Sequence, residues 1–215
     1  MKDKVVLYGL SFGIQFIVTI AVTILTVHYY PHKSAVVLFY NLNIVTFLTT
    51  FISLGIPQAL IRYQYIEDIN KGDLNQTVAL TSLFSTILAV VITFIIGGYQ
   101  TIFLVILLPF TVAQYYLRSI EDFRKFIGLY LGRLILIIIG SLTIFFFKSH
   151  DVLWWYVVVG FSYLIGVWFH PPIKGLSVNL NLLKSILEYS IPLQLYSFLL
   201  QGVFLVGQIV LEKYG

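Results

Sequence analysis

The sequence is short of charge and has no cysteine, and both features limit what the protein can be. The absence of cysteine excludes a disulfide, a thiolate metal site and a cysteine nucleophile. Charged residues make up only 10% of the 215 residues, whereas soluble domains carry about 25%. Because hydrophobic residues reach 59% and the mean hydropathy is +0.95, the composition predicts an integral membrane protein.

Seven long apolar runs follow one another, and a helix of about 20 apolar residues is enough to cross a bilayer. The fourth run is short and contains Pro109, which we expect to bend it. The pattern predicts an all-α integral membrane protein, a polytopic helix bundle. The runs are Val5–Val27, Ala35–Leu60, Thr77–Gly97, Thr101–Leu117, Phe126–Phe147, Val152–Phe169 and Tyr189–Leu211.

The positive charges are divided unequally between the two sides of this predicted bundle. Lys and Arg are retained on the cytoplasmic side of a membrane. We therefore expect an inner-membrane protein with a cytoplasmic amino terminus and cytoplasmic loops at Gly72, Ser119 and Gly175. The net charge of +4 reflects this topology rather than nucleic-acid binding. Nine cations fall on one side and three on the other: Lys2, Lys4, Arg62, Lys71, Arg118, Arg124, Lys125, Lys174 and Lys184 against Lys33, Lys148 and Lys213.

No carboxylate lies deep inside an apolar run, but two arginines enter the runs. Arg62 ends the second run and Arg133 lies within the fifth. A membrane cavity lined in this way favours an anion over a cation. Arg133 either extends back to the headgroups or faces a wet cavity, and the sequence leaves both readings open.

Polar side chains recur at helical spacing in the first and seventh runs. Such a stripe faces protein or water, because an amide facing lipid is costly. It serves either as interhelical hydrogen bonding or as the wall of a cavity, and both readings stay open. The residues are Ser11, Gln15, Thr19 and Thr23 in the first run, and Ser190, Gln194, Ser197, Gln201 and Gln208 in the seventh.

The starts of these two runs also resemble each other. The segment 11–15 (Ser-Phe-Gly-Ile-Gln) matches 190–194 (Ser-Ile-Pro-Leu-Gln) in pattern, and the six spans between them give both copies the same orientation, as in a parallel repeat. We expect a six-helix lobe over 1–170, a cytoplasmic linker over 171–188 and the first helix of a second lobe over 189–215. Since one span cannot complete a lobe, we expect a fragment, a truncated product or half of an assembly.

Three stretches resemble the polysaccharide-repeat-unit flippases, the Wzx-type branch of the superfamily that also contains the multidrug and toxin extrusion exporters and the lipid II flippases. Their order and spacing carry the resemblance, which covers essentially all of this chain but only the first half of a family member. The stretches are Leu54-Gly55-Ile56-Pro57-Gln58-Ala59-Leu60-Ile61-Arg62-Tyr63, Tyr115-Tyr116-Leu117-Arg118 with Tyr130-Leu131-Gly132-Arg133, and Ile186-Leu187-Glu188-Tyr189-Ser190-Ile191-Pro192-Leu193.

The resemblance implies a multipass transporter that moves a polyprenyl-pyrophosphate-linked oligosaccharide across the cytoplasmic membrane for cell-surface polysaccharide (O-antigen or capsule) biosynthesis. The implied partners are that substrate, membrane lipids and the missing carboxyl-terminal lobe, with no nucleic acid, cofactor or metal. Family members often carry an acid near the end of the seventh span, whereas 206–210 of this chain has none, so a coupling-ion role does not transfer. The candidate substrate-binding residues are Arg133, Arg62, Arg118, Gln15, Gln194 and Gln201.

Three other functions are weighed against flipping. A multidrug or cation antiporter of the same fold would need a buried carboxylate, which the runs lack. A membrane enzyme would need a framed acid, base or metal site, but the outer residues His28, His32, His150 and Asp151 lie in loops too short to frame one, so we expect no catalytic residue. A non-catalytic scaffold could use the G-x-x-x-G of Gly128 and Gly132 to pack against a partner helix.

Overall fold

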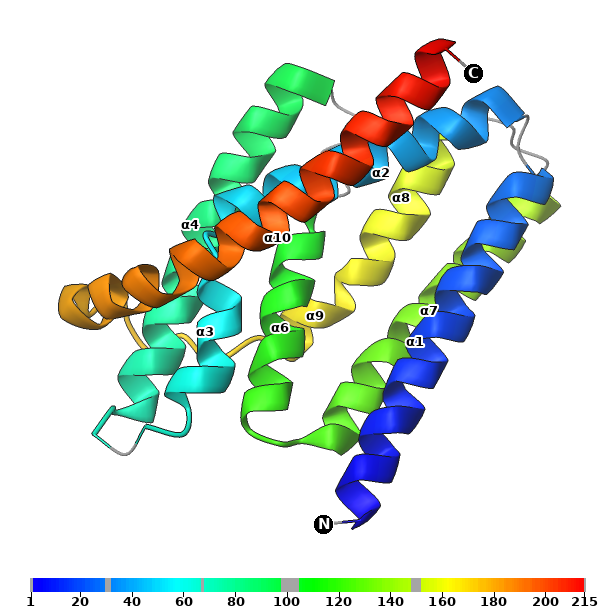
Figure 1. Ribbon diagram of the computed structural model, residues 1–215. Helices are drawn as coiled ribbons and strands as arrows, with labels where there is room; N and C mark the ends of the chain where they lie inside the picture. Colours follow the sequence, from blue (N-terminus) through cyan, green and yellow to red (C-terminus); the bar gives the residue numbers. More distant parts are fainter. Residues whose placement is uncertain (1, 30–31, 67, 98–104, 148–151, 215) are drawn as a thin grey trace.

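The computed structural model describes residues 2–29, 32–66, 68–97, 105–147 and 152–214, and over these residues it is helical with no strand. Long apolar sequences become helices in a membrane because a helix satisfies all its backbone hydrogen bonds within one segment. The helices, shown in Figure 1, are α1 (Lys2–Tyr29), α2 (His32–Ile52), α3 (Ile56–Tyr63), α4 (Lys71–Gly97), α6 (Leu107–Ser119), α7 (Phe123–Phe146), α8 (Val152–Tyr163), α9 (Ile165–Trp168) and α10 (Leu180–Tyr214).

Two helices within the described residues are long and apolar enough to cross a membrane. They are the Lys71–Ile92 part of α4 and the whole of α7. The pair α2 and α3 passes the same test when taken together, although the two helices are bent by 56° at their junction. The all-helical structure thus has two, or three, candidate membrane-spanning helices.

The helices form an open bundle in which α1 pairs with α7 along one side and α10 crosses the other side (Figure 1). α7 also packs on α8, and α6 packs on α3, α4, α7 and α9. One apolar core lies among α2, α6, α7 and α8 and includes Leu38, Phe110, Phe126 and Tyr156. A second core lies among α3, α4, α6 and α10 and centres on Leu60. Inside lipid such cores are held by close packing rather than by expulsion of water.

The second predicted span, Ala35–Leu60, is not continuous. α2 ends at Ile52, and two successive residues adopt left-handed backbone angles, Leu54 at φ 49° and Gly55 at φ 71°. Pro57 then lies in the first turn of α3, where its missing N–H costs nothing. This sequence therefore stops one helix and starts another at an angle, which a hydropathy pattern does not reveal.

Three other predicted spans differ at their ends. In the fourth, residues 101–104 lie outside the described residues, Val105 is helical, Ile106 is a turn, and α6 begins at Leu107 with Pro109 in its first turn. The sixth is interrupted at Leu164, between α8 and α9. The seventh begins at Leu180 and continues through Pro192, and its first turns lie at an angle to the rest in Figure 1. The linker predicted over 171–188 is consequently non-helical only as far as residue 179.

That short linker is fastened to the start of α4. The side-chain amide of Gln76 donates to the carbonyl and the hydroxyl of Ser177, at 2.7 and 2.9 Å. The backbone N–H of Asn179 donates to Thr77 Oγ1, and Asn179 Oδ1 in turn accepts from the N–H of Leu182. Asn179 thereby caps α10, so the linker fixes where α10 begins.

Candidate functional site

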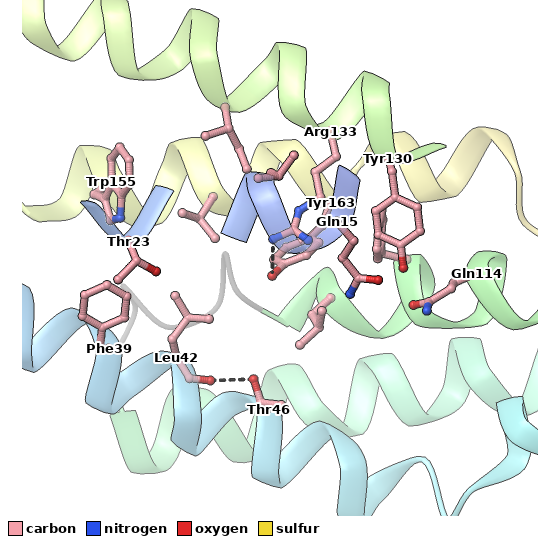
Figure 2. A pocket seen from close by; sticks show the side chains of 15 residues that line it. Gln15, Thr23, Phe39, Leu42, Thr46, Gln114, Tyr130, Arg133, Trp155 and Tyr163 are labelled. Atoms are coloured by element: carbon pink, nitrogen blue, oxygen red, sulfur yellow. Dashed lines mark hydrogen bonds between the residues drawn. The ribbon is translucent and has the colours of Figure 1, made fainter. Parts of the chain in front are cut away.

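A cavity of about 300 Å³ lies inside the bundle between α1, α2, α6, α7 and α8 (Figure 2). Each of the five helices contributes three side chains to its wall, so the cavity exists only where all five meet. None of the described residues that line it is an acid. They are Gln15, Val18 and Thr23; Phe39, Leu42 and Thr46; Leu107, Phe110 and Gln114; Tyr130, Arg133 and Ile137; and Trp155, Val159 and Tyr163.

Arg133 reaches this cavity from the middle turns of α7 and is held there by aromatic residues. Its Nη2 donates to the hydroxyl of Tyr163 at 3.0 Å. Its Cζ lies 4.3 Å from the centre of the Tyr163 ring and 5.4 Å from that of Phe110. A cation is attracted to the faces of aromatic rings, which stabilises it by about 0.5–2 kcal/mol. The guanidinium is therefore fixed toward the cavity and is not extended to the end of the helix.

The charge of Arg133 is not neutralised within the part of the chain that the structure describes. No carboxylate there forms an ion pair with it, and its Nε is buried without a hydrogen-bond partner. A buried cation without a partner is costly, so such a group favours an anion beside it. Arginine suits phosphate in particular, because its planar fork can donate two parallel hydrogen bonds.

Several polar groups of the cavity lie around Arg133. Figure 2 shows the side chains of Gln15 and Gln114 and the hydroxyl of Tyr130 on the same side as Arg133, whereas Trp155 and Phe39 lie toward the other side. The Tyr130 hydroxyl is buried and has no hydrogen-bond partner among the described residues. The cavity thus has a cationic, hydrogen-bonding end and a mainly aromatic end to which Thr23 adds one hydroxyl, and this division suits an amphipathic anion.

Of the six residues predicted to bind substrate, only Arg133 and Gln15 line this cavity. Arg62 is exposed at the end of α3, with its Cζ 4.0 Å from the ring of Tyr189. Arg118 ends α6, with its Cζ 5.7 Å from the ring of Tyr115. The structure does not bring these two guanidinium groups to the cavity.

The predicted amide stripe of the seventh span also lies elsewhere. Gln194 is buried and donates to the carbonyl of Thr50 in α2 at 2.7 Å, so it joins two helices and lines no part of the cavity. This is the interhelical hydrogen bonding that the sequence left open. The side chains of Gln201 and Gln208 lie outside what the structure describes, as do those of Ser11 and Thr19 in the first run.

The structure also bears on the residues that an enzyme or a scaffold would use. His150 and Asp151 lie outside the described residues, and among those described no three His, Asp or Glu residues come together as metal ligands. An added Cβ on Gly132 would lie 3.1 Å from the Ile165 side chain, so Gly132 packs inside the bundle, whereas an added Cβ on Gly128 would meet nothing within 4 Å. Only half of the G-x-x-x-G is therefore used for packing here.

The sequence does not single out the two residues that hold Arg133, Tyr163 and Phe110, or Trp155 at the other end of the cavity. Each lies in an apolar run, where an aromatic residue most often fills a core. A search of protein-family models, of curated proteins and of solved structures finds no match to this chain.

Proposed function

We propose that this chain is a membrane transporter, or a truncated part of one, that moves a lipid-linked oligosaccharide, joined through pyrophosphate to a polyprenyl chain, across the cytoplasmic membrane. The observation that carries the proposal is the guanidinium of Arg133. It is held by two aromatic rings in a cavity inside a helical bundle and has no ion pair with any described carboxylate. In this role Arg133 contacts the pyrophosphate.

The rest of the cavity supports an amphipathic anion as the cargo. The amides of Gln15 and Gln114 and the hydroxyl of Tyr130 lie around Arg133, where they would donate hydrogen bonds to phosphate or sugar oxygens. The part of the wall that includes Trp155 and Phe39 is mainly apolar and suits the hydrocarbon of the polyprenyl chain. A cavity of about 300 Å³ holds a diphosphate with the groups next to it, so passage of a whole oligosaccharide requires the bundle to open.

The proposal extends to the topology of the bundle. It comprises a six-span lobe, a cytoplasmic amino terminus and a second lobe begun by α10, as in the flippases that the sequence resembles. No covalent chemistry is required, because the substrate only changes sides. A cation antiporter is less well supported, since the described part of the cavity wall contains no acid.

A reconstituted flipping assay tests this function. The protein is placed in vesicles with a polyprenyl-pyrophosphate-linked oligosaccharide, and a glycan-modifying reagent outside measures how much substrate has crossed. Arg133→Gln should nearly abolish crossing, and Arg133→Lys, which keeps the charge but loses the fork, should reduce it partially.

The matched control is Arg124→Gln, which makes the same change at an exposed position in the first turn of α7. This variant should flip substrate like the wild type. If Arg133→Gln and wild type transport equally well, Arg133 is not a substrate residue and the proposal loses its main support.

A further inference from the structure

Outside the cavity, the most unusual part of the molecule is the break between α2 and α3, which α10 covers. On the α2 side, the ring of Phe198 lies 4.4 Å from that of Phe47 and 5.1 Å from that of Phe51. One turn earlier in α10, Gln194 donates to the carbonyl of Thr50. α10 is thus fixed against the last turns of α2 by both apolar and polar contacts.

At the break itself, α10 packs so closely against the backbone of Gly55 that no larger residue would fit there. A Cβ on Gly55 would lie 2.9 Å from the carbonyl oxygen of Ser190 and 3.0 Å from Gln58 Oε1. The Cβ of Ser190 lies 3.1 Å from the same point. Oxygens of α3 and α10 therefore converge beside Gly55, whose φ of 71° also requires glycine.

Three side-chain oxygens around this break are buried and have no hydrogen-bond partner in the part of the chain that the structure describes. They are Ser190 Oγ, Gln194 Oε1 and Gln58 Oε1. Ser190 is 0% exposed and Gln194 is 4% exposed. Because Gln194 donates its amide N–H to Thr50, the oxygen of that amide is left as an acceptor. Buried acceptors without a donor are rare in folded proteins and indicate a bound water or ion.

The unpartnered side-chain atoms at the break are oxygens, and a cation is coordinated by oxygens. The negative end of the α2 dipole lies at Ile52 and the positive end of the α3 dipole at Ile56, so the two dipoles oppose each other at the break and the oxygens decide which ion it suits. The nearest basic side chain along α3 is Arg62, which is exposed and stacks on Tyr189, and it donates no hydrogen bond to any of the three acceptors. The three oxygens are therefore left for a bound water or a small ion.

We propose that the α2–α3 break, closed by α10, binds a small monovalent cation, with Na⁺ as the probe. Gln58, Ser190 and Gln194 supply the side-chain oxygens. These ligands are all neutral, whereas a divalent ion such as Ca²⁺ is held by carboxylates. Broken helices bind monovalent ions in this way, through unwound backbone and the carboxyl ends of half-helices. The cation would join both parts of the broken helix to α10.

Thermal unfolding of the purified protein in detergent tests the site. NaCl is titrated against choline chloride at constant ionic strength, and a parallel series uses KCl. The unfolding midpoint should rise saturably, by about 3 °C, with at least one of the two alkali cations but not with choline. Ser190→Ala should weaken the apparent cation affinity by about five- to tenfold.

The matched control is Ser197→Ala, which makes the same change two turns further along α10, where the hydroxyl bonds only its own helix. It should keep the full response. Binding of ²²Na⁺ gives a second readout that does not depend on unfolding. A wild-type response in Ser190→Ala, or a midpoint that responds to neither alkali cation, would overturn the proposal. The latter outcome identifies the break as a water site.

This site is independent of the anion cavity, so the two ideas fail separately. Arg133→Gln should leave the cation response unchanged, because Arg133 contacts none of the three ligands.

Discussion

The guanidinium of Arg133 lies 4.3 Å from the ring of Tyr163, and its Nη2 donates to the hydroxyl of the same residue. One tyrosine thus contributes a ring face that attracts the charge and an acceptor that fixes its direction. A carboxylate in that place would neutralise the cation and compete with an incoming anion. Aromatic support holds the charge in place and leaves it available.

Removing only the hydroxyl of Tyr163 should therefore loosen Arg133 without removing it. Tyr163→Phe keeps the ring and loses the hydrogen bond, which stabilises by about 1 kcal/mol. We expect affinity for pyrophosphate to fall by about fivefold in a titration of the purified chain. The control is Tyr156→Phe in the same helix. Its hydroxyl accepts from Asn41 at 2.6 Å and does not line the cavity. Equal binding by the two variants would contradict this role for Tyr163.

At the scale of the helix, two glycines show where close packing positions the site. A Cβ on Gly166 in α9 would lie 2.5 Å from the Cα of Phe110 and 3.1 Å from its backbone nitrogen. Because the obstacle is backbone, Gly166→Ala should push α9 off α6 and destabilise the protein by about 1–3 kcal/mol, measured by thermal unfolding.

The matched change is Gly128→Ala in α7, where the new methyl group would meet nothing within 4 Å. This variant should be neutral, or more stable by up to about 1 kcal/mol, because alanine is the better helix former. Equal destabilisation by both substitutions would show that α9 does not rest on Phe110 in this way.

The start of α7, the helix that carries Arg133, depends on Asp122. The Asp122 carboxylate accepts from the backbone N–H of Lys125 at 3.1 Å and pairs with its Nζ at 2.8 Å. These bonds from Lys125 lower the pKa of Asp122 below its usual value of 3.8. Because this pKa is lowered by folding, its stabilisation is complete above pH 3.8 and is lost as the pH falls through the lower, folded value.

Asp122→Ala should accordingly destabilise the protein by about 1 kcal/mol at neutral pH, measured as a change in the unfolding midpoint. Asp122→Asn should keep most of the cap and lose the pH dependence, since an amide accepts the same hydrogen bond without titrating. If the alanine variant is as stable as the wild type at neutral pH, Asp122 does not stabilise the start of α7.

For the whole molecule, the sequence predicts where the helices are better than it predicts where they break and how they pack. Apolar runs locate the helices, and depth in a run singles out Arg133. The break at Leu54 and Gly55 depends on two left-handed residues, which hydropathy does not report. Because of that bend and the crossing of α10, Arg62 and Gln194 lie outside the cavity. A prediction from their polarity alone therefore puts them in the wrong place. Tyr163 and Phe110 are missed because aromatic residues in apolar runs look the same whether they fill a core or hold a cation.

The orientation of the whole bundle can be tested by labelling, since the chain has no cysteine of its own. Ser119 is only 2% exposed, so it is a poor position for a probe. Leu176 in the linker and Phe147 at the far end of α7 are 92% and 79% exposed. The uneven distribution of Lys and Arg predicts that an impermeant thiol reagent outside intact cells labels Phe147→Cys and not Leu176→Cys. The reverse pattern would invert the topology.

The central claim is that Arg133 binds the anionic part of a prenyl-pyrophosphate substrate, and a binding titration tests it most directly. The purified chain is titrated with a short isoprenyl pyrophosphate and with the matching uncharged prenyl alcohol. The wild type should bind the pyrophosphate and not the alcohol. Arg133→Gln should weaken that binding by about 10- to 100-fold, as expected for the loss of a charged hydrogen bond. Equal affinity of wild type and Arg133→Gln for the pyrophosphate would contradict the account.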